Sequence, residues 1–135
     1  MLSLDSGGNF QGYIGDLCRM GVIGEPDAEL HDLLAEIETV QRAALQAIPS
    51  ASFTDFFAHG MGLITHEAPF LMTNHPVAYE GVDAERPLEA GMVISVETTM
   101  LHPNRGFIKL EDTVAIKEGG HELLGDRARA WNVNG

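Results

Sequence analysis

Two histidines seven residues apart, His59 and His66, are the first candidates for chemistry in this chain. Gly60 and Gly62 follow the first histidine, and Pro69 closes the segment after the second. Glycine lets a backbone approach a ligand closely, and neutral imidazole is both a common metal ligand and a general acid or base. A structural role explains this segment equally well, because histidines in glycine-rich loops are often simply hydrogen-bonded.

A first pair of carboxylates, Asp5 and Asp16, lies in two segments near the amino terminus with strand character, over residues 1–5 and 10–19. If the chain reverses at residues 10–11, the two aspartates stand directly opposite each other, with Cβ atoms about 5 Å apart. Carboxylates that close repel unless a proton or a cation lies between them. The alternative interpretation is a pair of solvated aspartates in turns.

A second pair of carboxylates comes from the clearest strand signals, over residues 92–100 and 107–116. Both segments are rich in β-branched residues, which is typical of strands. A hairpin centred on Asn104 places Glu97 opposite Glu111. Two acidic pairs and a glycine-flanked histidine have one common explanation, a carboxylate-rich metal site.

Four carboxylates and an imidazole suit two divalent ions that share bridging ligands. Such a pair holds a water between the ions, lowers its pKa and polarises the carbonyl that the resulting hydroxide attacks. The oxygen-rich ligand set favours Mn²⁺, with Co²⁺, Fe²⁺ and Zn²⁺ as alternatives. The second histidine, His66, is then free to hydrogen-bond the substrate.

One strong helix signal lies between the two groups of candidates. Residues 25–27 open it, with Pro26 in the first turn and acidic residues at the positive end of the helix dipole, and Pro49 stops it. Apolar residues recur there at helical spacing, at Leu30, Leu33, Leu34, Ile37, Val40, Ala44, Leu45 and Ile48. The connecting segments are predicted to be a turn at residues 6–8, a connection at 21–24, a surface loop over 70–87 and a loose polar tail over 125–135, apart from Trp131.

Composition narrows the class of protein. The 135 residues suit one domain, and a net charge of −12 argues against nucleic acid and anionic membranes as partners. No segment approaches the roughly 18 apolar residues of a membrane helix, and no signal peptide is visible. Cys18 is the single cysteine, so a reducing compartment is expected, and we predict a cytoplasmic protein in which Cys18 is a buried structural thiol.

Taken together, these segments resemble the pita-bread metallopeptidases, the superfamily of methionine aminopeptidase, Xaa-Pro aminopeptidase and prolidase. The resemblance implies an α+β fold, a partial pita-bread domain with a curved antiparallel sheet and a flanking helix, and it implies that residues 1–135 form the C-terminal part of a catalytic domain. The segments that carry the resemblance span nearly the whole chain, namely Leu4-Asp5-Ser6-Gly7, Gly12 to Arg19, His59-Gly60-Met61-Gly62, His66-Glu67-Ala68-Pro69, Gly91 to Glu97 and Lys109 to Val114.

The resemblance also implies a set of metal ligands. Asp5 would chelate one ion, and Asp16 would bridge both ions. His59 and Glu97 would bind the second ion, and Glu111 would be the other bridging ligand.

The catalytic roles that the resemblance implies fall on His66 and Glu97. His66 would contact the substrate carbonyl or stabilise the oxyanion, and Glu97 would also move protons at the bridging water. Residues 105–113 are most similar to Xaa-Pro peptidases, which cleave the bond between an N-terminal residue and proline. The implied partner is a peptide or small-molecule substrate, and a homo-oligomer is left open because half of the family's domain is missing from the chain.

Three departures from the family keep other functions open. The chain begins at the first metal aspartate, the segment between Asp16 and His59 is shorter than in the family, and Thr98-Thr99 replaces a common Pro-Gly. A lyase or hydrolase that does not act on peptides is one alternative. The other is an inactive truncated remnant that associates with itself through exposed sheet edges.

Overall fold

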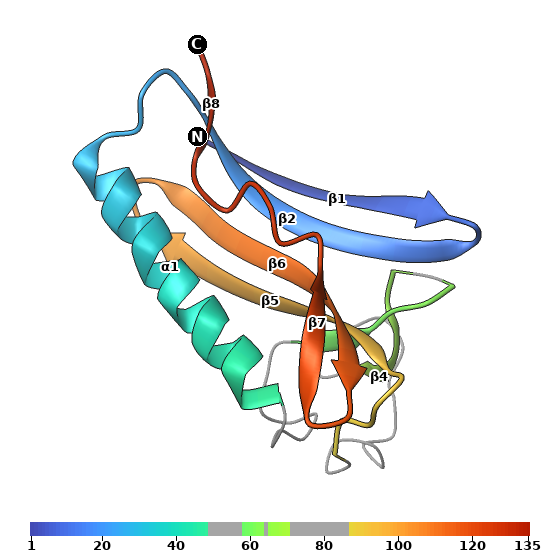
Figure 1. The fold of residues 1–135 in the computed structure, drawn as a ribbon. Helices are drawn as coiled ribbons and strands as arrows, with labels where there is room; N and C mark the ends of the chain where they lie inside the picture. Colours follow the sequence, from blue (N-terminus) through green and yellow to red (C-terminus); the bar gives the residue numbers. More distant parts are fainter. Residues whose placement is uncertain (49–57, 64, 71–86) are drawn as a thin grey trace.

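The computed structural model describes residues 1–48, 58–63, 65–70 and 87–135. Within these residues, one antiparallel sheet has the strand order β1-β2-β6-β5-β3-β4, with β7 added beside β6 and β8 paired parallel to β2 (Figure 1). The elements are β1 (Leu2–Phe10), β2 (Tyr13–Ile23), α1 (Ala28–Ala47), β3 (Ala58–Gly60), β4 (Glu67–Phe70), β5 (Val93–His102), β6 (Gly106–Lys117), β7 (Gly120–Leu124) and β8 (Asn132–Asn134). In this part of the chain, no helix is long and apolar enough to cross a membrane.

The register of the β1–β2 hairpin corrects the predicted opposition of the two aspartates. The turn lies at residues 11–12, so Asp5 pairs with Cys18, and Asp16 pairs with Gly7. The prediction placed the turn one residue too early, which displaced the pairing by two residues. Because side chains alternate with a period of two along a strand, a displacement of two leaves both carboxylates on the same face of the sheet.

The predicted turn at residues 6–8 is also wrong, because β1 continues through its glycines to Phe10. Gly7 is needed for close strand pairing, since a Cβ at this position would lie 2.7 Å from the carbonyl oxygen of Gly15. The chain reverses later, where the backbone N–H of Gly12 donates to Asn9 Oδ1 over 3.0 Å. Asn9 therefore fixes the turn.

The β5–β6 hairpin forms in the predicted register, with Glu97 directly opposite Glu111. Alternation along these two strands gives the sheet two chemically distinct faces. One face carries Ser95, Glu97, Lys109, Glu111 and Thr113, and the other carries Ile94, Val96, Leu110, Asp112 and Val114.

Helix α1 covers the apolar face, lying alongside β5 and β6 (Figure 1). Asp27 is its N-cap and accepts a hydrogen bond from the backbone N–H of Leu30 over 2.9 Å, so Pro26 precedes the helix and does not occupy the predicted first turn. The buried apolar side chains of α1 pack against Ile94, Val96, Ile108, Leu110 and Val114 in two clusters. The predicted stop at Pro49 and most of the predicted loop over 70–87 lie outside the described residues.

The C-terminal segment is anchored not only at Trp131, which the prediction of a loose tail excepted, but also through strand β8, which corrects that prediction. Trp131 is buried, and its Nε1–H donates to the carbonyl of Leu30 over 3.0 Å. Strand β8 follows and pairs with residues 21–23 of β2. The predicted connection at 21–24 is therefore largely strand, because β8 supplies it with a hydrogen-bonding partner.

Candidate metal centre

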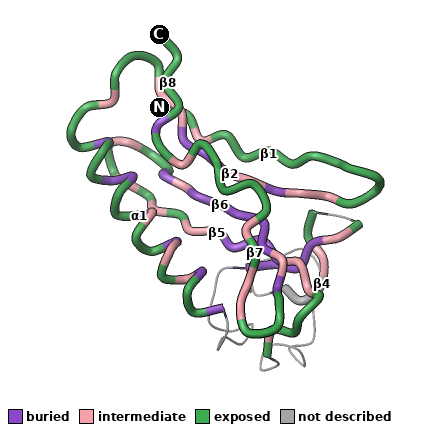
Figure 2. The backbone as a smooth tube through the Cα atoms, viewed as in Figure 1, coloured by how far each residue is buried: buried purple, intermediate pink, exposed green. Residues whose placement is uncertain are grey.

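Five potential metal ligands share the face of the sheet opposite α1. Asp5 and Asp16 come from the β1–β2 hairpin, His59 from β3, and Glu97 and Glu111 from the β5–β6 hairpin. Two pairings fix this common face, because Cys18 stands opposite Glu111 and Ser95 stands opposite His59. Buried residues are concentrated in the central strands, whereas β1 is largely exposed (Figure 2).

Asp16, His59 and Glu111 converge most closely. One ligand atom from each of these three side chains lies within 4.8 Å of the others, and all three residues are buried. His59 Nε2 is 3.4 Å from Glu111 Oε1, which also accepts a 2.6 Å hydrogen bond from the hydroxyl of Ser95. This arrangement presents two carboxylates and one imidazole to a common point, a donor set that suits Mn²⁺, Fe²⁺, Co²⁺ or Zn²⁺.

The two buried carboxyls differ in acidity. Burial raises the pKa of Asp16 to about 6, and the negative charges of Glu111 and Asp5 add to this effect. Burial also opposes ionisation of Glu111, but hydrogen bonds from His59, Ser95 and Lys109 outweigh it and lower the pKa of Glu111 to about 2. The pKa of His59 is raised despite burial, because its hydrogen bond to Glu111 favours the charged ring. Glu111 is therefore the ionised centre of the cluster, with Asp16 carrying a proton at mildly acidic pH.

Asp5 and Glu97 both contact Lys109, a residue that the sequence analysis did not single out. Its Nζ lies 2.6 Å from Asp5 Oδ2, 2.7 Å from Glu97 Oε2 and 3.0 Å from Glu111 Oε2. The sequence alone could have placed Lys109 on the acidic face, because side chains alternate along a strand and a residue two positions before Glu111 must share its face. Asp5 is half exposed, whereas the side chains of Glu97 and Lys109 are mostly covered.

His66 lies beside His59. The two imidazole rings are nearly parallel, with centroids 4.1 Å apart, and His66 is exposed whereas His59 is buried. Burial of part of the ring and the neighbouring His59 both lower the pKa of His66. The outer ring is thus placed to meet a ligand that reaches the buried cluster.

A second network supports the site from behind the sheet. Gln41 of α1 is fully buried, and its Nε2 donates to the carbonyl of Val96 and to Asp112 Oδ2, while its Oε1 accepts from the hydroxyl of Thr98. Val96 and Thr98 flank Glu97, and Asp112 follows Glu111. The network thereby fixes the strand on both sides of Glu97 and on the C-terminal side of Glu111.

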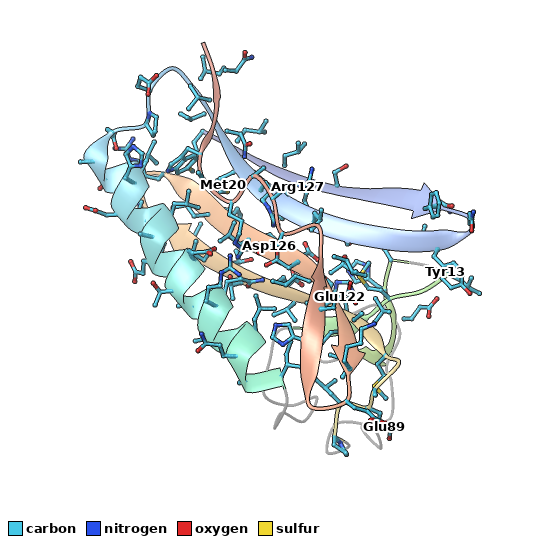
Figure 3. The ribbon with its side chains drawn as sticks, viewed as in Figure 1. Tyr13, Met20, Glu89, Glu122, Asp126 and Arg127 are labelled. Carbon is cyan, nitrogen blue, oxygen red and sulfur yellow. The ribbon has the colours of Figure 1, made fainter. Side chains whose placement is uncertain are left out.

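Arginines complete this network. Arg19 Nη1 donates to the carbonyl of Glu111 over 2.7 Å, and its Nη2 donates to Asp112 Oδ1 over 2.6 Å. Arg129 binds both carboxylate oxygens of Asp112 through Nη1, each over 2.7 Å. The segment that follows β7, where Asp126 and Arg127 lie, crosses next to β2 and brings Arg129 into this position (Figure 3). Sequence reasoning missed these residues because their partners are far away along the chain.

A cavity of about 830 Å³ opens beside Asp16. Its lining is mostly apolar and includes Tyr13, Ile14, Met61 and Val93. Tyr13 stands at the turn end of the β1–β2 hairpin (Figure 3). The buried cluster therefore borders a space that is large enough for a small organic ligand.

In the residues that the structure describes, a curved antiparallel sheet with one flanking helix and carboxylates gathered on the face opposite that helix defines a pita-bread protein, as the sequence predicted. The chain belongs to metallopeptidase family M24, whose model matches residues 1–55 and 50–118. Membership in this metallopeptidase family implies the use of divalent metal. The convergent side chains of Asp16, His59 and Glu111 are suited to bind such an ion.

Known relatives share this fold over part of their length. The Xaa-Pro dipeptidase of Pyrococcus furiosus is 27% identical over 92% of this chain. The crystal structure of dipeptidase PepE from Mycobacterium ulcerans is 27% identical with a TM-score of 0.75 over 97% of this chain. The X-Pro aminopeptidase of Thermotoga maritima, 24% identical, has the same fold with a TM-score of 0.78 over 98%. The chain spans 39% of the length of the first two relatives and 41% of the third.

Proposed function

We propose that this chain forms the metal-binding part of a peptidase that removes an N-terminal residue from short peptides, with preference for a bond that precedes proline. The convergence of Asp16, His59 and Glu111 on one buried point carries this proposal. The names of the similar proteins, dipeptidase and X-Pro aminopeptidase, support the substrate class. In this reading, residues 1–135 are the C-terminal part of the catalytic domain.

We assign the ligand roles as follows. Asp5 would hold one divalent ion, His59 and Glu97 would hold a second, and Asp16 and Glu111 would serve both, and the convergence of Asp16, His59 and Glu111 supports this set. Mn²⁺ is the favoured ion because carboxylate oxygens dominate the donor set. The chemistry supplied by bound metal is a lowered pKa for water and a polarised carbonyl group.

The remaining groups act on the substrate and its protons. His66, stacked outside His59, hydrogen-bonds the scissile carbonyl and stabilises the negative charge that develops on its oxygen. Glu97 accepts a proton from the attacking water and returns it to the leaving amine. The apolar cavity beside Asp16 receives a side chain of the peptide.

Calorimetric titration of the metal-free chain with Mn²⁺ tests the ligand assignment. Asp16→Ala and Glu111→Ala should each remove most of the affinity, whereas Glu122→Ala, on the exposed strand β7, should bind as the parent does. Unchanged Mn²⁺ binding by both cluster variants would refute the assignment.

The substrate class needs a separate experiment. The Mn²⁺-loaded chain should hydrolyse Xaa-Pro peptides, and the His66→Ala variant should bind Mn²⁺ normally but lose most of this activity. Turnover of small zwitterions in place of peptides would instead favour a lyase or hydrolase on the same fold.

A further inference from the structure

The buried side chain of Thr113, on β6, is bonded to the backbone of Asp16 on the neighbouring strand β2. The backbone N–H of Asp16 donates to Thr113 Oγ1 over 2.9 Å, and Thr113 Oγ1 donates to the backbone carbonyl of Asp16 over 2.7 Å. A hydroxyl can make both bonds at once, because it has one O–H donor and two acceptor lone pairs. One side chain thus satisfies both backbone groups of a candidate metal ligand.

The pairing of the two strands explains why a side chain is needed at this position. Strands β2 and β6, both described over their full length, share one backbone pair, Cys18 with Glu111. Asp16 lies two residues before Cys18, and Thr113 lies two residues after Glu111, so a continued antiparallel ladder would pair Asp16 with Thr113 through their backbones. The hydroxyl replaces that pair and supplies the partners that buried backbone groups require.

This contact bears directly on the acidic cluster. Thr113 and Glu111 share the face of β6 toward which the carboxylate of Asp16 converges. On its other side Asp16 pairs with Gly7 of β1, which has no side chain to support it. The hydroxyl of Thr113 is therefore the group through which β6 fixes the backbone of Asp16 close to Glu111.

We propose that Thr113 is a positioning residue of the metal centre, whose hydroxyl sets the separation of Asp16 and Glu111. The inference rests on the proposed metal centre, in which these two carboxylates serve both ions, and adds a residue that binds neither metal nor substrate. Removal of groups that orient metal ligands lowers metal affinity about 10–100-fold, so a displaced Asp16 should weaken binding measurably.

Calorimetric titration with Mn²⁺ compares the parent with Thr113→Val, which keeps the shape of the side chain and removes its hydroxyl. At a temperature at which both are folded, Thr113→Val should bind Mn²⁺ about tenfold more weakly or worse. Thr113→Ser restores the hydroxyl and should recover most of the affinity. Thr39→Val is the matched control, because it removes an exposed hydroxyl that bonds only to the carbonyl of Ala35 in its own helix over 2.8 Å, and it should bind as the parent does.

Amide hydrogen exchange of the metal-free chain gives a second readout, which does not depend on metal. The N–H of Asp16 should be protected in the parent and should exchange about tenfold faster in Thr113→Val, since it loses its only printed acceptor on β6. The amides within α1 should exchange alike in both. Rapid exchange at Asp16 in the parent would contradict the hydrogen bond on which the positioning role depends.

The titrations separate failure of this role from failure of the metal centre. Binding by Thr113→Val equal to that of the parent, together with lost affinity in Asp16→Ala, would overturn the positioning role and leave the centre intact. If Thr113→Val does not fold, Thr113→Ala should show the same loss of affinity, and failure of both variants to fold would assign the hydroxyl to stability alone. A folded parent that binds no Mn²⁺ would overturn the metal centre and this role with it.

Discussion

Gln41 and Asp112 are joined across the interface between helix and sheet, where Gln41 Nε2 donates to Asp112 Oδ2 over 2.9 Å. Neither residue is a candidate metal ligand, yet Gln41 contacts residues next to both glutamates, and Asp112 directly follows Glu111 in the chain. Gln41 reaches Val96 and Thr98 on either side of Glu97. The position of the acidic pair thus depends on a hydrogen-bond network on the opposite face of the sheet.

Replacing Gln41 with leucine should therefore be costly. The substitution leaves Asp112 and the carbonyl of Val96 buried without this donor, and an unmet buried polar group costs about 1–3 kcal/mol. We expect a loss of about 2–4 kcal/mol in the free energy of unfolding, measured by urea denaturation. Gln46→Leu, on the exposed side of the same helix, should change stability by less than about 0.5 kcal/mol. Equal effects of the two substitutions would show that the network contributes nothing specific.

Asp112→Ala should be more damaging than the loss of any surface ion pair. It removes the shared partner of Arg19 and Arg129 and leaves two largely buried guanidinium groups without it. Breaking a buried pair on one side costs about 3–5 kcal/mol. Glu122→Ala breaks the exposed pair with Lys117 and should cost less than about 1 kcal/mol. Thermal melts of the two variants in one buffer test the difference, and a mild effect of Asp112→Ala would contradict it.

The acidic cluster predicts a pH dependence for the metal-free chain. The pKa of Asp16 rises from 3.8 to about 6 on folding, so its contribution favours the folded state below pH 3.8 and is lost as the pH rises through 6. Glu111 has the opposite sign, since its pKa falls from 4.5 to about 2, and its contribution is lost only as the pH falls below 4.5. Between pH 4.5 and 6 the melting temperature should therefore decrease.

Asp16→Asn should abolish that decrease, because the amide does not titrate. The resulting change in melting temperature is to be measured by calorimetry at several pH values. Asp32→Asn, on the exposed side of α1, serves as the control and should retain the parent's profile. A flat profile for the parent would mean that Asp16 does not hold its proton in the folded chain.

Association between copies is predicted from β1. Its outer edge pairs with no other strand among the described residues, and Leu2 and Leu4 are 61% and 59% exposed. Exposed edges with apolar side chains favour pairing with another chain. Sedimentation should show association that increases with concentration, and Leu4→Lys should reduce it. Val40→Lys, an exposed site on α1, should not, and a monomer at all concentrations would contradict the prediction.

The sequence predicted the elements best where local patterns are strong. The helix and the β5–β6 hairpin follow from apolar spacing and β-branched residues, and Glu97 indeed stands opposite Glu111. The burial of Cys18 was also predicted correctly. The β1–β2 register was missed because glycines usually mark turns, whereas here they permit close strand pairing and Asn9 sets the reversal.

The rest of the site depends on contacts that no local pattern reveals. Arg129 reaches Glu38 and Asp112, and Trp131 reaches Leu30, all through tertiary packing of a segment whose composition is that of a loop. Lys109 is different, since alternation from Glu111 places it on the acidic face without any structure. A pattern of metal-binding residue types does not indicate it, because a protonated lysine is not a metal ligand.

The single paired position between β2 and β6, Cys18 with Glu111, has a topological consequence. The candidate ligands lie on both sides of the boundary between β2 and β6. Asp5 and Asp16 are on the β1–β2 hairpin, whereas His59, Glu97 and Glu111 are on β3, β5 and β6. A cation bound there would act as a reversible cross-link between segments that are distant along the chain, and such a link offsets part of the entropy of closing a long loop. Chelation would then remove this link between the two hairpins, while the core that α1 shares with Met20 of β2 and with strands β5 and β6 remains packed.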